Sequence, residues 1–296
     1  MKILRFGTRK SALALAQTHL IMDAVRRAHP EYQTELVPIV TTGDVNMKPF
    51  SEASDKFGIK GLFTQELEQA LLDGSIDAAV HSLKDVPAAV SARLPLIAFY
   101  HRDDPRDALV LREGMSADRI SLIGCSSARR RIQIAELFPA ARVEPVRGNV
   151  ETRLRKLDEG QFDALVLAAA GLKRLGLGQR ISRFLSVDEV VPAPGQGILA
   201  VQGRAEGEYD GWLDALRDAD TADCAKAERA FSSRLNGGCA APVGAFAHIT
   251  GDTLVLKGFF ADEARGFKLH GSVTGPRVRA RELGIELADH LLEEAR

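Results

Sequence analysis

Two stretches of the sequence, LEQALLDGSIDAAV at residues 67–80 and LRKLDEGQFDALV at residues 154–166, share one pattern. Each begins as an amphipathic helix, stops at a glycine, and continues through Asp-Ala into an apolar strand. A second pair, RFGTRKSALALAQ at 5–17 and LIGCSSARRRIQIA at 122–135, has the opposite order of strand, polar turn with Arg and Ser, and helix. This repeat predicts two similar α/β lobes with a cleft between them.

The rest of the chain is arranged around the repeat. The segment VVPAPGQGILA at 190–200 contains two prolines and two glycines, and we interpret it as a hinge where the chain crosses back to the first lobe. After about residue 216 the pattern changes to a helix, a cysteine-bearing loop, short strands and a terminal helix, which is typical of a small α+β domain. The predicted domains are residues 1–98 with 197–215, residues 99–196, and residues 216–296.

Composition excludes several classes of protein. The 296 residues are 45% hydrophobic and 27% charged with a net charge of −1, which argues against a nucleic-acid binder with its usual basic excess. The first residues, MKILRFGTRKS, lack the apolar region of a signal peptide, and no apolar run has membrane-spanning length. Three cysteines without a CxxC pair fit neither a disulfide framework nor a zinc site. We therefore expect a cytoplasmic protein that binds no membrane and no metal.

Basic residues recur at the predicted strand-to-helix turns. Backbone N–H groups and the helix dipole make such turns anion sites, and arginine adds a bidentate match to carboxylate or phosphate. For any one residue a solvated charged face is the simpler explanation, but so many at equivalent turns favour a polyanion site. The sequence has no GxxxxGK[ST] phosphate loop, so a nucleotide is not expected. The basic residues in question are Arg9, Lys10, Lys84, Arg129, Arg130, Arg131, Arg147 and Arg153.

An acidic residue and a histidine mark the end of one of these strands, in HSLKDVP at 81–87. On spacing alone, Asp85 would be a turn former or the partner of Lys84 in a surface pair. Among cations, however, a single carboxylate could stabilise developing positive charge. We interpret His81 as a packed or hydrogen-bonded histidine rather than a ligand.

The cysteine of NGGCAAPVG at 236–244 lies behind two glycines, in a loop that would leave its sulfur accessible. A helix C-terminus does not lower a thiol pKa, so activation of Cys239 would have to come from nearby arginines. We expect Cys125 and Cys224 to be buried structural residues. Position alone leaves the role of Cys239 undecided.

Taken together, the motifs resemble the porphobilinogen deaminase family, also called hydroxymethylbilane synthase, over nearly the whole chain. That resemblance implies two periplasmic-binding-protein-like α/β lobes and a small α+β domain. It also implies a dipyrromethane cofactor attached through a thioether to Cys239, where a soft sulfur nucleophile would form a bond that survives turnover. The motifs are TRKSALALAQ, GDV, GIKGLFTQELE, DAAVHSLKDVP, DDPRDALV, SSARRRIQ, RGNVETRLRKLDEGQFDALVLAAAGLKRLG, PAPGQG, and ERAF followed by GGCAAPVGAFA.

The activity that the resemblance implies is the head-to-tail condensation of four porphobilinogen molecules with release of ammonia, followed by hydrolytic release of the linear tetrapyrrole. Each ring carries an acetate and a propionate, so cofactor and product together bring twelve carboxylates to the protein, which accounts for the arginines. The implied partners are porphobilinogen and the growing oligopyrrole, and we expect a monomer. The alternative is a non-enzymatic two-lobed anion- or solute-binding protein, for which the GGC motif would have no purpose.

The resemblance also implies roles residue by residue. Asp85 would be catalytic: it would accept pyrrole N–H bonds, stabilise the cation formed as ammonia leaves, and help to pass protons. The implied cofactor-binding residues are Cys239, Lys84, Asp85, Ser126, Ser127, Arg129 and Arg130. The implied substrate-binding residues are Arg9, Ser11, Lys60, Phe63, Arg147, Arg153 and Gln196.

Overall fold

The structure is a computed structural model that describes residues 2–41, 64–209, 211–235 and 242–296. Its contacts divide the chain into two compact units, residues 1–102 with 198–226 and residues 103–197 with 227–296. The division into three domains made from the sequence remains a prediction. None of the helices in the described part of the chain is both long enough and apolar enough to cross a membrane.

The first unit is built on a five-stranded sheet in the order β2-β1-β3-β10-β4. Strand β1 is parallel to both of its neighbours, whereas β10 is antiparallel to β3 and β4. Strand β10 comes much later in the sequence than β3 and β4, yet it lies between them in the sheet. The strands are β1 (Lys2–Arg9), β2 (Tyr32–Ile39), β3 (Ala78–Ser82), β4 (Leu96–Tyr100) and β10 (Leu199–Gln202).

Helices α1 (Ala12–Ala28) and α4 (Gln65–Leu72) bury opposite faces of this sheet. Residues alternate along a strand, so Phe6 packs with α1 and with the Trp212 ring, whose centroid lies 5.6 Å away. On the other face, Leu67 and Leu71 of α4 pack with Ile76 and other apolar residues. The 3₁₀ helices of this unit are η1 (Leu83–Asp85) and η4 (Trp212–Leu216).

The second unit contains a sheet of the same topology, in the order β7-β6-β8-β5-β9. Here too the first three strands are parallel and the fourth is antiparallel to both neighbours. The prediction of two similar α/β lobes is therefore confirmed. In sequence, the antiparallel strands β5 and β10 each follow shortly after a point where the chain passes from one unit to the other. The strands are β5 (Asp107–Leu111), β6 (Leu122–Gly124), β7 (Arg142–Glu144), β8 (Ala164–Ala168) and β9 (Arg183–Leu185).

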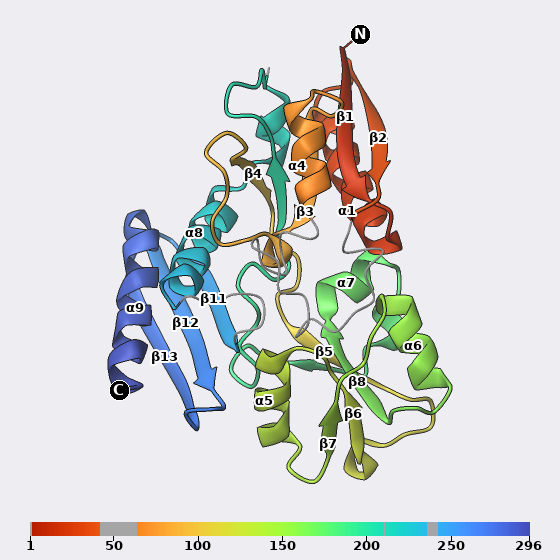
Figure 1. Ribbon diagram of the computed structural model, residues 1–296, viewed down its shortest axis with the longest axis vertical. Coiled ribbons are helices and arrows are strands. Elements are labelled where there is room, and N and C mark those ends of the chain that lie inside the picture. Colours follow the sequence, from red (N-terminus) through yellow and green to blue (C-terminus); the bar gives the residue numbers. More distant parts are fainter. Residues whose placement is uncertain (1, 42–63, 210, 236–241) are drawn as a thin grey trace. The chain divides into compact units, whose positions relative to one another are not determined.

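Helices α5 and α6 cover the two faces of the second sheet (Figure 1). Val166 of β8 shares one apolar cluster with Ile134 of α5, while its neighbour Leu165 shares another with Leu157 of α6. The helices are α5 (Ala128–Leu137), α6 (Val150–Asp158) and α7 (Ala169–Arg174), with 3₁₀ helices η2 (Ala117–Arg119) and η3 (Gly178–Arg180).

The C-terminal part is an antiparallel sheet in the order β11-β12-β13, covered by helix α9 as Figure 1 shows. Gly284 lets α9 approach α8 closely, because a Cβ at this position would lie 2.3 Å from the Ala227 carbonyl oxygen. The predicted small α+β arrangement is thus confirmed. Its elements are α8 (Ala219–Arg234), β11 (Val243–Thr250), β12 (Thr253–Asp262), β13 (Phe267–Pro276), η5 (Arg277–Arg279) and α9 (Ala280–Glu294).

Candidate active site

In the first lobe, the predicted catalytic residue follows strand β3 directly. Leu83 and Val86 are 1% and 2% exposed and anchor the η1 turn in an apolar cluster, and the Leu83 N–H donates to the Ile198 carbonyl. Between these anchors, Lys84 is half-buried and Asp85 is exposed. The alternation of apolar and charged residues therefore fixes the turn in the core and directs the Asp85 carboxylate outward.

The β1–α1 turn lies at the same edge of this sheet. Strands β1 and β3 run parallel with Gly7 opposite Ala79, so Arg9 at the end of β1 is level with the end of β3. The charge of Asp85 raises the pKa of His81 and the charge of Arg9 lowers it, so both charges act on the same strand end. Ser11 caps helix α1 by accepting the Ala14 N–H at 3.3 Å.

In the second lobe, the equivalent turn precedes helix α5. Ser127 is the N-cap of the helix, and its hydroxyl accepts the Arg130 N–H at 3.5 Å. Ser126 accepts the Val146 N–H at 3.1 Å and donates to the carbonyl of the same residue. These contacts tie the start of α5 to the loop that leads to Arg147.

Arg129 and Arg130 converge on a buried acid that the sequence analysis did not select, Asp107 at the start of β5. Arg129 Nη2 lies 2.8 Å from Asp107 Oδ2 in an ion pair. Arg130 donates to Asp107 Oδ1 from Nε at 3.0 Å and from Nη2 at 2.7 Å. Gln196 donates to the same oxygen at 2.8 Å. The structure thus brings together three of the predicted site residues around one carboxylate.

The charge of this cluster is unbalanced. Burial alone would raise the pKa of Asp107, but the charges of Arg129 and Arg130, with hydrogen bonds from Arg130 and Gln196, lower it well below its usual range. One ionised carboxylate between two guanidinium groups leaves the cluster with a net positive charge. This charge is buried, since Arg129 is only 3% exposed. Within the described residues, the buried Arg129 Nε has no hydrogen-bond partner. A buried cation with an unused donor is suited to an anionic ligand.

The other predicted arginines of this lobe lie around helix α6. Arg147 is exposed, and Arg153 is half-buried and donates from Nε to the Gly148 carbonyl at 2.8 Å. Burial lowers the pKa of Arg153, and the charge of Arg130 lowers it further, so the two guanidinium groups are near enough to repel. Asn149 caps α6 by accepting the Thr152 N–H at 2.8 Å.

One further basic residue was missed although it stands in a quoted motif, AAAGLKRLG. The side chain of Arg174, at the end of α7, is only 6% exposed and lies 3.3 Å from Asp103 Oδ2. Its Nη2 donates to the Gly197 carbonyl at 2.6 Å, which connects α7 to the 190–200 segment. The signal that could have found it is a basic residue at a helix end just after a buried strand.

Three of the predicted site residues, Lys60, Phe63 and Cys239, lie outside the described residues. Cys125 and Cys224 are both buried, as predicted. In the described ranges, no group of three or more His, Cys, Asp and Glu side chains could hold a metal ion.

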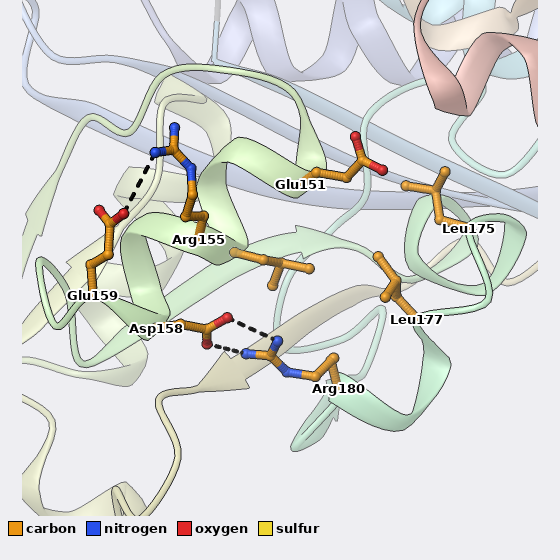
Figure 2. Close-up of a pocket in the computed structure, with 8 residues that line it drawn as sticks. Glu151, Arg155, Asp158, Glu159, Leu175, Leu177 and Arg180 are labelled. Atoms are coloured by element: carbon orange, nitrogen blue, oxygen red, sulfur yellow. Dashed lines mark hydrogen bonds and ion pairs between the residues drawn. The ribbon is translucent and has the colours of Figure 1, made fainter.

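A separate pocket of about 520 Å³ lies between α6, α7 and η3 (Figure 2). Leu154 and Leu177 contribute apolar surface, and ion pairs line it, including Arg180 with Asp158 at 2.6 Å. Three carboxylates against two arginines disfavour an anionic ligand in this pocket. The pocket contains none of the predicted site residues that the structure describes. Its lining residues are Glu151, Leu154, Arg155, Asp158, Glu159, Leu175, Leu177 and Arg180.

Fold and site together define a protein with two α/β lobes of equal topology, anion-binding groups at their strand-to-helix turns, and a small C-terminal α+β domain. Residues 4–209 match the family model described as "Porphobilinogen deaminase, dipyromethane cofactor binding domain", and residues 222–293 match "Porphobilinogen deaminase, C-terminal domain". The chain belongs to the porphobilinogen deaminase family.

Two relatives with the same name agree with this assignment. The porphobilinogen deaminase of Acetivibrio thermocellus is 47% identical over 298 residues, covering 100% of this chain and 99% of that protein. The porphobilinogen deaminase of Ruminiclostridium cellulolyticum is 46% identical over 287 residues, covering 97% of both. Among solved structures, the effector-binding domain of BenM with benzoate has a TM-score of 0.40 at 15% identity, covering 80% of this chain and 94% of that one.

The residues of the second lobe fit the cofactor that the family name specifies. A dipyrromethane carries carboxylate side chains, and the Arg129–Arg130–Asp107 cluster offers a net positive charge and an unused buried donor, Arg129 Nε. The serine hydroxyls at the α5 N-terminus add polar groups beside it. The donor set is therefore of the right chemistry for a carboxylate.

Proposed function

We propose that this chain is a hydroxymethylbilane synthase that condenses four porphobilinogen molecules head-to-tail, releasing ammonia, into linear hydroxymethylbilane for tetrapyrrole biosynthesis. The observation that supports it most is the buried, net positive cluster of Arg129, Arg130 and Asp107, in the region that matches the cofactor-binding domain of the family. A tetrapyrrole in assembly is rich in carboxylates, which is the chemistry that this cluster selects.

The dipyrromethane, when bound, supplies the first two rings of the chain that porphobilinogen extends. We propose that Cys239 holds it through a thioether. Arginine and serine side chains of the α5 turn bind its carboxylates, with Arg129 Nε as one donor. The full set proposed for the cofactor is Cys239, Lys84, Asp85, Ser126, Ser127, Arg129 and Arg130.

Asp85 is the proposed catalytic residue. Its exposed carboxylate stands at the strand end beside the half-buried Lys84 and Arg9, so it can face a bound ring while cations hold the ring's carboxylates. It accepts a pyrrole N–H, stabilises the positive charge that develops as ammonia leaves the substrate, and passes a proton during carbon–carbon bond formation.

The remaining residues bind the incoming and growing chain. Arginines at the turns form bidentate bonds with acetate and propionate groups, and Gln196 supplies an amide. We propose Arg9, Ser11, Lys60, Phe63, Arg147, Arg153 and Gln196 for this role. We also propose a cytoplasmic monomer that binds neither nucleic acid nor membrane, supported by the net charge of −1 and by the burial of Cys125 and Cys224.

Intact mass tests the proposed function. The purified protein should exceed its sequence mass by a two-ring adduct on the peptide that contains Cys239, and Cys239→Ser should lose both the adduct and the activity. Cys224→Ala is the matched control, because Cys224 is a buried thiol whose loss should leave the adduct in place. A fully active wild-type protein of unmodified mass would contradict the proposal.

A further inference from the structure

Asp107 is the common acceptor for side chains from two separate parts of the second unit. Its carboxylate is fully buried, and it receives Arg129 and Arg130 from helix α5 and Gln196 from the 190–200 segment. The residue itself is held at the start of β5, paired with Ala168 on one side and Leu185 on the other. Its position is therefore set by strand pairing on both sides.

We propose that Asp107 is a positioning residue for the cofactor: it sets the two arginines in the arrangement that binds the dipyrromethane carboxylates. This inference rests on the proposed function. Asp107 does not itself bind the anion, since like charges repel; it acts through Arg129 and Arg130.

Helix geometry shows why such a residue is needed. Consecutive residues of an α-helix leave the axis about 100° apart, so Arg129 and Arg130 start in different directions. Two guanidinium groups buried together also repel. A carboxylate between them removes this repulsion and turns both side chains toward one point, with contacts of 2.8 Å to Arg129 and 2.7 Å to Arg130.

The other contacts of the arginines complete the arrangement with neutral acceptors. Arg129 Nη1 donates to the Val191 carbonyl at 2.6 Å, and Arg130 Nη1 donates to the Val166 carbonyl at 3.3 Å. Gln133 holds Val191 in turn, accepting its N–H at 2.8 Å. Asp107 and Val191 thus fix the two terminal nitrogens of Arg129, while its buried Nε has no hydrogen-bond partner among the described residues.

The alternative is that Asp107 only joins β5 to α5, so that its loss would lower stability and nothing else. Asp163 is a matched control for that role. It is a second carboxylate of the same lobe, it pairs with Arg112 at 3.3 Å, and it accepts backbone N–H groups from Ser121 and Leu122 at 3.0 Å. Its contacts in the described part of the chain are with Arg112, Ser121 and Leu122 and not with the α5 arginines, so its loss should affect stability without affecting the cofactor.

The experiment compares Asp107→Asn, Asp107→Glu and Asp163→Asn by thermal unfolding and by intact mass. For Asp107→Asn we expect the fraction of purified protein that carries the two-ring adduct to fall about tenfold or more, the effect of losing charge-assisted bonds. Asp163→Asn should lower the melting temperature yet keep the adduct. Should Asp107→Asn fail to fold, Asp107→Glu takes its place, because it keeps the charge but displaces the carboxylate by one methylene.

A double variant shows whether Asp107 acts through the arginines. Combined with Arg129→Leu, the Asp107 substitution should lower the adduct fraction little further than Arg129→Leu alone, because the two residues serve one interaction. A wild-type adduct fraction in the Asp107 variants would overturn the inference. So would an adduct loss in Asp163→Asn as large as that in Asp107→Asn at a similar melting temperature, because the loss would then follow stability alone. Absence of the adduct from the wild type would instead refute the proposed function.

Discussion

The stability of the first unit should depend on pH through His81. This side chain is 7% exposed on strand β3, with Nε2 3.0 Å from Gln202 Oε1. Burial lowers its pKa from 6.5 to about 4, assisted by the charge of Arg9 and opposed by the Gln202 hydrogen bond and the charge of Asp85. The folded protein therefore holds His81 neutral at pH values where the unfolded chain protonates it.

The sign and the size follow from this difference. Between pH 6.5 and 4 the unfolded state binds more protons, so the stabilisation is complete above pH 6.5 and is lost as the pH falls. Each pKa unit corresponds to about 1.4 kcal/mol, so His81 accounts for a loss of about 3 kcal/mol in total and about 2 kcal/mol by pH 5. Few carboxylates titrate between pH 7 and 5, which makes this the useful range.

Urea unfolding at pH 7, 6 and 5 measures the effect. The single tryptophan, Trp212, is buried in the core of the unit that contains His81, so its fluorescence reports the relevant unfolding. His81→Gln keeps a donor for Gln202 and cannot titrate, and it should lose about 2 kcal/mol less than the wild type between pH 7 and 5. His19→Gln, an exposed position on α1, should behave as the wild type. Equal pH dependence in His81→Gln and wild type would refute the reasoning.

Three further predictions concern catalysis and packing. Asp85→Asn keeps the side-chain shape but removes the charge, so turnover should fall about 10²–10³-fold while the circular dichroism spectrum is unchanged; near-normal turnover would mean that another group carries this role. Arg129→Leu should lower the fraction of protein that carries the two-ring adduct, whereas Arg147→Leu should keep the adduct and accumulate an intermediate ring number in native mass spectra; identical spectra from the two variants would show that the arginines act as one undifferentiated field. Gly284→Ala should lower stability by roughly 1–3 kcal/mol in denaturant titrations, because its Cβ would meet the Ala227 carbonyl 2.3 Å away; unchanged stability would show that α9 shifts freely.

Local pattern predicted the lobes well because each repeated unit is a helix, a glycine stop and a strand in continuous sequence. The same reasoning predicted a polar turn with Arg and Ser before the helix within 122–135, and the structure shows Ser127 of that turn capping α5. A cap needs only its neighbours in sequence, so sequence is sufficient to find it.

The contacts of Asp107 could not be predicted in this way. In the motif DDPRDALV it is an acid before an apolar strand, a position that usually faces water. Its burial depends on the insertion of β5 between β8 and β9 and on arginines 22 and 23 positions later, which are long-range events. The contact of Arg174 with the Gly197 carbonyl depends in the same way on a distant part of the chain, the 190–200 segment.

The structure also separates the predicted anion-binding arginines into two kinds, and the physics of each suits a different task. Arg129 and Arg130 are buried, so water screens their charge little and a carboxylate bound there is held strongly. Arg147 is exposed and Arg9 half-buried, so solvent weakens their ion pairs and lets a ligand leave. A group that stays through every cycle needs the first kind of site. Rings that must move along as the chain grows need the second, because a site that bound each new ring as firmly as the cofactor would stop elongation there.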